Sequence, residues 1–172
     1  MHCPFCKIGV RNPPGNPTSD NVFLATEHVL GFLDIQPLVS SQAHVLITPR
    51  KHYVKMENMW NDSESSAELG RWLSKITKVL AEELKADSYN IIQNNGHSAG
   101  QVVDHVHFHV VIRKGGENIP VDEGWPEKLR QRLSYSALVF GRGVREDLDA
   151  DWTNHIVPRL RSRIKKLDQE RL

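Results

Sequence analysis

The segment from Asp104 to Val111, which reads DHVHFHVV, is the strongest constraint on how this chain can fold. Its three histidines, His105, His107 and His109, alternate with apolar residues. Because successive side chains of a β-strand point to opposite faces, a strand here would place all three imidazoles on one face. Neighbouring imidazoles would then stand about 6.6 Å apart along the strand, a spacing suited to lining a cleft around a group the size of a phosphate.

Three interpretations fit this pattern. A half-buried strand could carry histidine on its polar face by chance, although histidine has no special preference for strands. The alternation could also form a three-histidine metal centre, since pairs at i, i+2 on strands occur as zinc ligands. Alternatively, an imidazole near its pKa can attack phosphorus while its neighbours donate hydrogen bonds to the phosphoryl oxygens.

Composition narrows the class of protein. A length of 172 residues suits one domain, and 39% hydrophobic with 25% charged residues is typical of globular chains. The 22 Lys+Arg against 21 Asp+Glu give no electrostatic attraction to nucleic acid or to a membrane. The apolar runs are too short to span a bilayer, and two cysteines without a readable secretory signal favour the cytoplasm or nucleus.

Hydrophobic periodicity predicts an α+β protein with a mostly antiparallel sheet and one long packed helix. The helix is capped by Asp62 or Ser63 and runs through Leu84, with Glu83 as the only charged residue in its apolar stripe. The expected strands are 22–25 and 29–34, which form a hairpin, followed by 44–48, 89–94 and 102–112.

Sequence motifs place the chain near a known family. The segment from His105 to Val111 matches the histidine-triad pattern, and the chain resembles the HIT nucleotide-binding superfamily, within it the Hint-like branch of fungal-type adenosine 5'-monophosphoramidases. The resemblance covers residues 3–113 and implies a HIT-like fold and a homodimer. Further matches in order and spacing are Phe32–Ile35, Val45–His52, Asn94–Gly96, Ala99–Gln101 and Ile112–Arg113.

The C-terminal third of the sequence has a different residue pattern from the part that precedes it. We expect residues 1–113 to form the HIT domain and residues 114–172 a helical extension packed on or near it. Residues 127–133 are a candidate short helix, and 152–167 a longer one that kinks or begins at Pro158. Residues 136–143 look like the extension of fungal Hint-like members. The basic residues of the last helix are interpreted as a solvated face rather than a nucleic-acid surface.

The resemblance implies a mechanism. His107, the middle histidine, would attack the α-phosphate of a nucleotide and form a nucleotidyl-histidine intermediate that water hydrolyses. Such chemistry needs a neutral imidazole, with one nitrogen free to attack and the other donating a hydrogen bond to a main-chain carbonyl. His109 would bind the phosphate oxygens, where a donor strengthens its bond as negative charge builds up.

The resemblance also implies nucleotide-binding roles. Asp34 would accept hydrogen bonds from the ribose hydroxyls, since a carboxylate carries acceptors only. Asn94 would hydrogen-bond near the phosphate, and Gln101 would complete the cradle with neighbouring N–H groups. Phe32 and Ile35 would sandwich the base, although a plain core role is nearly as good an interpretation for both.

One position departs from the family. Val102 stands where members commonly place a serine or threonine whose hydroxyl serves the leaving group. The leading hypothesis is a hydrolase that releases AMP from a purine-nucleotide conjugate such as an adenosine phosphoramidate or aminoacyl-adenylate. Alternatives are a dinucleoside polyphosphate hydrolase of the Fhit type, a nucleotide-binding regulatory protein with little turnover, and a zinc nucleic-acid module, against which overall neutrality counts.

The N-terminal cysteines form a second motif. Cys3 and Cys6 could be a redox dithiol, a chance pair or half of a zinc site, and zinc would need two further ligands. Some HIT proteins supply these from the Pro-x-x-His segment and the first triad histidine, which here are His52 and His105. The resemblance thus implies a structural zinc ion held by these four residues, and no organic cofactor is expected.

Overall fold

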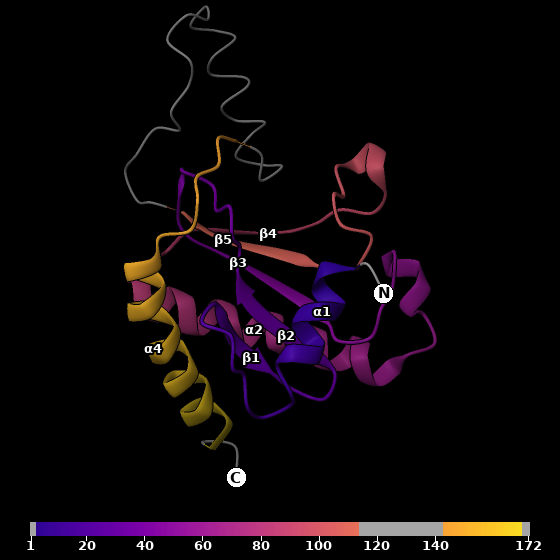
Figure 1. Ribbon diagram of the computed structural model, residues 1–172, viewed down its shortest axis with the longest axis horizontal. Helices are drawn as coiled ribbons and strands as arrows, with labels where there is room; N and C mark the ends of the chain where they lie inside the picture. The colour runs from indigo at the N-terminus through magenta and orange to yellow at the C-terminus, as the bar shows by residue number, and fades with distance from the viewer. Residues whose placement is uncertain (1–2, 114–142, 170–172) are drawn as a thin grey trace, which may run out of the picture.

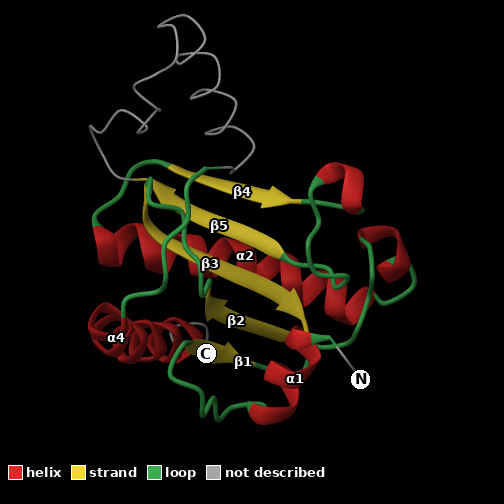
Figure 2. Ribbon diagram, turned by 45° about the horizontal axis from the view of Figure 1, so that its top comes forward, coloured by secondary structure: helices red, strands yellow, loops and turns green. Residues whose placement is uncertain are grey.

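The computed structural model describes residues 3–113 and 143–169, which form a five-stranded antiparallel sheet with helices packed against it (Figures 1 and 2). The strand order is β1-β2-β3-β5-β4, so β1 and β4 are the edges. The strands are β1 Val22–Ala25, β2 Val29–Leu33, β3 Ser41–Pro49, β4 Tyr89–Gln93 and β5 Phe108–Arg113. The helices are α1 Pro4–Arg11, α2 Ser63–Leu84 and α4 Ala150–Gln169, with short 3-10 turns η1 Met56–Met59 and η2 His97–Ala99. The α+β class is confirmed.

Helix α2 covers one face of the sheet (Figure 2). Asp62 caps its N-terminus, because the carboxylate accepts a hydrogen bond from the backbone N–H of Ser65 at 3.0 Å. The apolar stripe predicted from the sequence packs on the sheet. Its buried members are Leu69, Trp72, Ile76, Val79 and Leu80, which share a core with Val45, Ile47, Val110 and Ile112.

Helix α1 packs on the opposite face and was not predicted. It begins with proline at its first position, which suits a helix start because proline lacks the N–H that would be unpaired there. Phe5 of α1 shares a second core with Leu30, Phe32 and Leu46. Since side chains alternate along β2, Leu30 and Phe32 face α1 while their neighbours face α2.

Helix α4 packs against α2 and β1, at the side of the sheet away from β4 (Figures 1 and 2). It starts at Ala150 and contains Pro158, so the expectation that it begins at the proline is wrong. The expected helix at 127–133 and residues 136–142 lie outside the described residues. Within the described part of the chain, no helix has the length and apolar character needed to cross a bilayer.

The strand expected over 102–112 is shorter than predicted, because β5 begins only at Phe108. The backbone N–H of His105 bonds to the carbonyl of Val103 at 2.7 Å, which closes a tight turn. The N–H of Val106 then bonds to the carbonyl of Tyr53 at 2.7 Å, outside the sheet ladder. The first histidine of the triad therefore lies in a turn, and only the third lies in a regular strand.

Candidate functional site

Two groups of titratable side chains lie next to the histidine triad. The thiol–histidine cluster consists of Cys3, Cys6, His52 and His105, and the aspartate–histidine group of Asp34, His44 and His109. Within each group the possible ligand atoms lie within 4.8 Å of one another. His107 lies between His105 and His109 in the chain and belongs to neither group.

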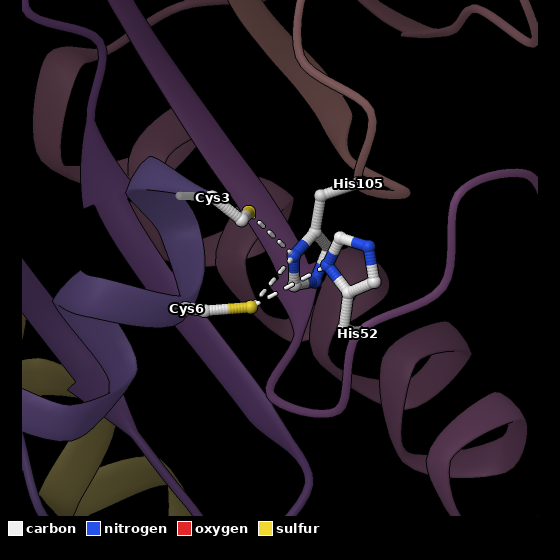
Figure 3. A group of neighbouring side chains, drawn as sticks. All are labelled: Cys3, Cys6, His52 and His105. Atoms are coloured by element: carbon white, nitrogen blue, oxygen red, sulfur yellow. Dashed lines mark hydrogen bonds between the residues drawn. The ribbon is translucent and has the colours of Figure 1, made fainter. Parts of the chain in front are cut away.

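The thiol–histidine cluster draws its members from three parts of the fold (Figure 3). Cys3 and Cys6 lie at the start of α1, His52 follows β3, and His105 lies in the turn before β5. The sulfur of Cys3 is 3.3 Å from Nδ1 of His105, and the sulfur of Cys6 is 3.4 Å from Nδ1 of His52 and 3.7 Å from that of His105. Zn–S bonds of about 2.3 Å and Zn–N bonds of about 2.0 Å place tetrahedral S and N ligands roughly 3.5 Å apart.

The hydrogen bonds of His105 also suit a metal ligand. Its Nε2–H donates to the carbonyl of Pro49 at 2.9 Å, and since a carbonyl can only accept, Nδ1 keeps its lone pair toward the two thiols. Burial lowers the pKa of His105 to about 4, which keeps it neutral. Burial, then the hydrogen bond with Cys3, raises the pKa of Cys6 to about 11, so this thiol needs a cation to ionise at neutral pH. The four residues fit a tetrahedral metal site.

His107 has a defined tautomer. Its Nδ1–H donates to the carbonyl of His105 at 2.6 Å, so Nε2 carries a lone pair. His107 is 5% exposed, and its ring packs edge-on against Phe5, with 5.2 Å between ring centroids. Burial lowers the pKa of His107, which favours the neutral form. A neutral imidazole with one free lone pair is the form that acts as a nucleophile.

The aspartate–histidine group is a chain of donors and acceptors. The backbone N–H of Leu38 donates to Nδ1 of His44 at 3.4 Å, so His44 carries its proton on Nε2. That proton is donated to Nδ1 of His109 at 2.9 Å. Burial lowers the pKa of His44 to about 4 and that of His109 to about 3, so both are neutral near pH 7. His109 is left with its proton on Nε2.

The rings of His107 and His109 lie side by side with 5.0 Å between their centroids and an interplanar angle of 72°. His107 precedes the start of β5, so the two histidines are not two positions of one regular strand. One ring has a free lone pair and the other a free N–H. Such a pair can attack an electrophilic centre and donate a hydrogen bond to the charge that develops there.

Asp34 follows β2, and its side chain is 10% exposed. One oxygen accepts from the backbone N–H of Gln36 at 3.0 Å, and the other accepts from Arg145 at 2.9 Å. Nε2 of His44 lies 3.5 Å from that second oxygen. With a guanidinium already on the carboxylate and the His44 proton directed at His109, this group does not offer the converging lone pairs that a metal ion requires.

Gln101 is buried and ties loops together. Its amide N–H groups donate to the carbonyls of Val54 at 2.7 Å and Val103 at 3.0 Å, and its carbonyl oxygen accepts from the N–H of Gly96 at 2.6 Å. Both amide hydrogens are thus used by the backbone. Gln101 shapes the segment around residues 96–103 and has no free donor for a ligand.

The remaining predicted residues differ in exposure. Asn94 is half-buried just beyond β4, and Val102 is 92% exposed. Phe32 is 2% exposed and packs against Phe5, with 5.3 Å between ring centroids, whereas Ile35 is 69% exposed. Of the two residues expected to sandwich the base, only Ile35 therefore has an exposed surface.

Three residues near the site were missed at the level of sequence. His44 shares a strand face with Leu46, an alternation that periodicity could have revealed. Phe5 lies between Cys3 and Cys6, and a single apolar residue in that motif does not indicate a contact with His107. Arg145 is 111 positions from Asp34 and carries no local signal.

Comparison with known proteins places this geometry in a family. The family model described as HIT domain matches residues 16–116. The adenosine 5'-monophosphoramidase hnt1 of Schizosaccharomyces pombe is 39% identical over 73% of this chain and 84% of its own length. The adenosine 5'-monophosphoramidase HNT1 of Candida albicans is 33% identical over 99% of this chain and 96% of its own length. A zinc-bound histidine triad family protein from Mycobacterium smegmatis shares the fold with a TM-score of 0.66 and 28% identity, over 99% of this chain and 98% of that one.

Proposed function

The chain belongs to the HIT domain family, and on that premise we propose that it hydrolyses purine-nucleotide conjugates in which AMP carries a small leaving group, such as adenosine phosphoramidates. The observation that carries this proposal is the tautomer of His107. Because its Nδ1–H is held by the carbonyl of His105, the lone pair on Nε2 is available beside the donor of His109.

The proposed reaction has two displacements at phosphorus. Nε2 of His107 attacks the α-phosphorus, the bond from phosphorus to the leaving nitrogen breaks with its electron pair, and the departing amine takes a proton from solvent. Water then attacks the nucleotidyl-histidine, loses a proton to solvent, and the phosphorus–Nε2 bond breaks to give AMP and neutral His107. In both steps Nε2–H of His109 donates to a phosphoryl oxygen, where its bond strengthens as charge develops.

The surrounding residues support substrate binding in this proposal. Asp34 accepts from the ribose hydroxyls, and Asn94 donates near the phosphate. Gln101 acts through the backbone that it holds, because its amide hydrogens are already used. Ile35 offers an exposed apolar surface for the base, while Phe32 supports that region from the core.

The leaving group separates this proposal from its rival. Val102 is 92% exposed and has no hydroxyl, so the leaving-group side is open and lacks a protein donor at this position. An amine that can be protonated by solvent suits such a site. A dinucleoside polyphosphate hydrolase would use the same His107 and differ only in the group released.

One experiment tests the proposal. The chain is incubated with adenosine 5'-phosphoramidate and, separately, with diadenosine triphosphate, and wild type is compared with His107→Ala. We expect faster AMP release from the phosphoramidate, loss of that release by about 10⁴-fold or more in the variant, and an acid-trapped AMP adduct on wild type only. His155→Ala, on the exposed side of α4, is the matched control and keeps full activity. Equal turnover by wild type and His107→Ala would reject His107 as the nucleophile.

We also propose that the thiol–histidine cluster holds a structural zinc ion. The support is the near-tetrahedral spacing of Cys3, Cys6, His52 and His105 and the lone pair that His105 directs at the thiols. A bound zinc ion would cross-link α1 to the segments that follow β3 and precede β5. It would also fix the carbonyl of His105, which accepts from His107.

We also propose that the protein forms a homodimer. Strand β4 is an edge of the sheet, and its residues Tyr89 and Ile91 are 46% and 45% exposed. A groove of about 470 Å³ lies between this strand and α2, so a second copy could pair here. Sedimentation equilibrium showing only monomer would exclude the dimer.

We further propose that residues 1–113 form the HIT domain and residues 114–172 its extension.

A further inference from the structure

We propose that Arg145, on the C-terminal extension, is a positioning residue for ribose recognition that acts by holding the carboxylate of Asp34. This inference rests on the proposed function, because it assigns the partner of a residue expected to bind the ribose. Arg145 lies beyond the 16–116 segment that matches the family. The chain would thus use its extension to complete the nucleotide site.

The backbone around Arg145 is paired with the loop that carries Asp34. The N–H of Val39 donates to the carbonyl of Val144 at 3.0 Å, that of Glu146 to the carbonyl of Pro37 at 3.1 Å, and that of Leu148 to the carbonyl of Ile35 at 3.0 Å. Leu38 and Arg145 form an isolated antiparallel bridge. The extension is therefore fixed along the whole loop between β2 and β3.

The side chain of Arg145 turns this backbone pairing into a contact with the site. One guanidinium nitrogen donates both to Oδ2 of Asp34, at 2.9 Å, and to the carbonyl of Gln36. The backbone N–H of Gln36 donates to Oδ1 of Asp34 at 3.0 Å, so both carboxylate oxygens are anchored. An ionised carboxylate has about four acceptor positions, which leaves room for ribose hydroxyls after these bonds are made.

The charge balance explains why the anchor is an arginine. Asp34 is a buried carboxylate, 10% exposed, and the two histidines beside it are neutral. A buried carboxylate is costly without an ionic or hydrogen-bonding partner. Arg145, whose side chain is 37% exposed, supplies that charge from the solvent side and leaves the His44 proton for His109.

The inference predicts a loss of ribose discrimination when the anchor is removed. Binding of AMP and of 2',3'-dideoxy-AMP is measured by calorimetry on the full chain, for wild type and Arg145→Met. We expect wild type to prefer AMP by about 10- to 100-fold, as for two hydrogen bonds to a charged group, and Arg145→Met to prefer it by less than about 3-fold. Affinity for the dideoxy nucleotide should change little.

Two further variants separate positioning from general damage. Arg145→Lys keeps the charge and one donor, so it should recover part of the preference, while Glu146→Gln, the neighbour that engages the loop through its backbone, should match wild type. If Arg145→Met keeps the wild-type preference, or weakens AMP and dideoxy-AMP equally, the inference is wrong and the proposed function stands. If wild type binds neither nucleotide, the proposed function fails as well.

Discussion

The two groups beside His107 both bring ligand-type atoms together and differ in where their hydrogens point. In the thiol–histidine cluster, His105 gives its proton to a carbonyl outside the cluster and turns its lone pair inward, toward Cys3 and Cys6. In the aspartate–histidine group, the proton of His44 points at the lone pair of His109. In the first group the lone pair of His105 faces the two thiols, whereas in the second group the His44 donor is already paired with His109 and the Nε2–H of His109 stays free.

Proximity of ligand-type atoms therefore does not define a metal site. Both groups gather their atoms within 4.8 Å, yet only one has its lone pairs convergent. The second group also carries the guanidinium of Arg145 on its carboxylate, where a divalent cation would have to compete. The same chain thus directs a histidine lone pair at two thiols on one side of His107 and uses histidine as a proton-bearing donor on the other.

The largest effect that tests this contrast is loss of the metal. In Cys6→Ser, we expect zinc content to fall from about one ion per chain to well under one, with affinity reduced by about 100-fold or more, because serine does not replace a thiolate ligand. Metal analysis of the purified chain, with thermal unfolding in parallel, measures this.

The same zinc measurement must also give a definite result for the aspartate–histidine group. A variant of the aspartate–histidine group, such as His44→Phe, must keep its zinc. If Cys6→Ser retained one tightly bound zinc ion, or if His44→Phe lost it, the assignment of the two groups would be reversed or wrong.

A smaller effect is expected on catalysis when the donor chain is broken. His44→Phe removes the proton that fixes the tautomer of His109, so we expect kcat for AMP release to fall by about 100-fold with KM little changed. Steady-state kinetics with adenosine 5'-phosphoramidate provide the test. His28→Phe, a change at a half-buried histidine in the β1–β2 turn, is the control. A fall in kcat that is equal in both variants would remove the special role of His44.

The sequence predicted which histidines lie close together better than it predicted the local backbone that carries them. The alternating histidines predict a shared face, and this reasoning holds for the proximity of His107 and His109. The strand itself begins later than expected, because pairing with neighbouring strands depends on the turn that Val103 and His105 form. No periodicity within the segment encodes that turn.

Contacts between residues far apart in the chain are the second feature that the sequence alone could not predict. The cysteine pair could be joined to His52 and His105 only through the family resemblance, since their distance in the chain carries no geometric information. The pairing of Arg145 with Asp34 had no signal at all, because it depends on how the extension returns along the β2–β3 loop. Glu83 stood out as a charged residue in the apolar stripe of the helix. The residues that pair with it, Arg159 and Arg163, lie in α4 and could not be identified from the helix pattern.

Glu83 provides the smallest and most selective test, because it is a charged group outside both histidine groups. Its side chain is 2% exposed in the stripe of α2 and pairs with Arg159 and Arg163 of α4. The basic face of the last helix is thus partly used inside the molecule. We expect Glu83→Gln to lower the free energy of unfolding by about 2 kcal/mol, between the values for exposed and buried pairs.

The neighbouring residue supplies the matched control for that measurement. Glu82 is 48% exposed and pairs with Lys78 one turn away and, at 3.7 Å, with Arg163 of α4, and both partners are themselves exposed, so Glu82→Gln should cost less than about 0.5 kcal/mol. Urea unfolding compares the two variants, and zinc content and kcat should match wild type in both. Equal destabilisation by the two changes would show that the α2–α4 pairing is a surface contact. Loss of activity in Glu83→Gln would instead tie α4 to the histidine groups. We do not expect that result, because Glu83 pairs with α4 and is a member of neither group.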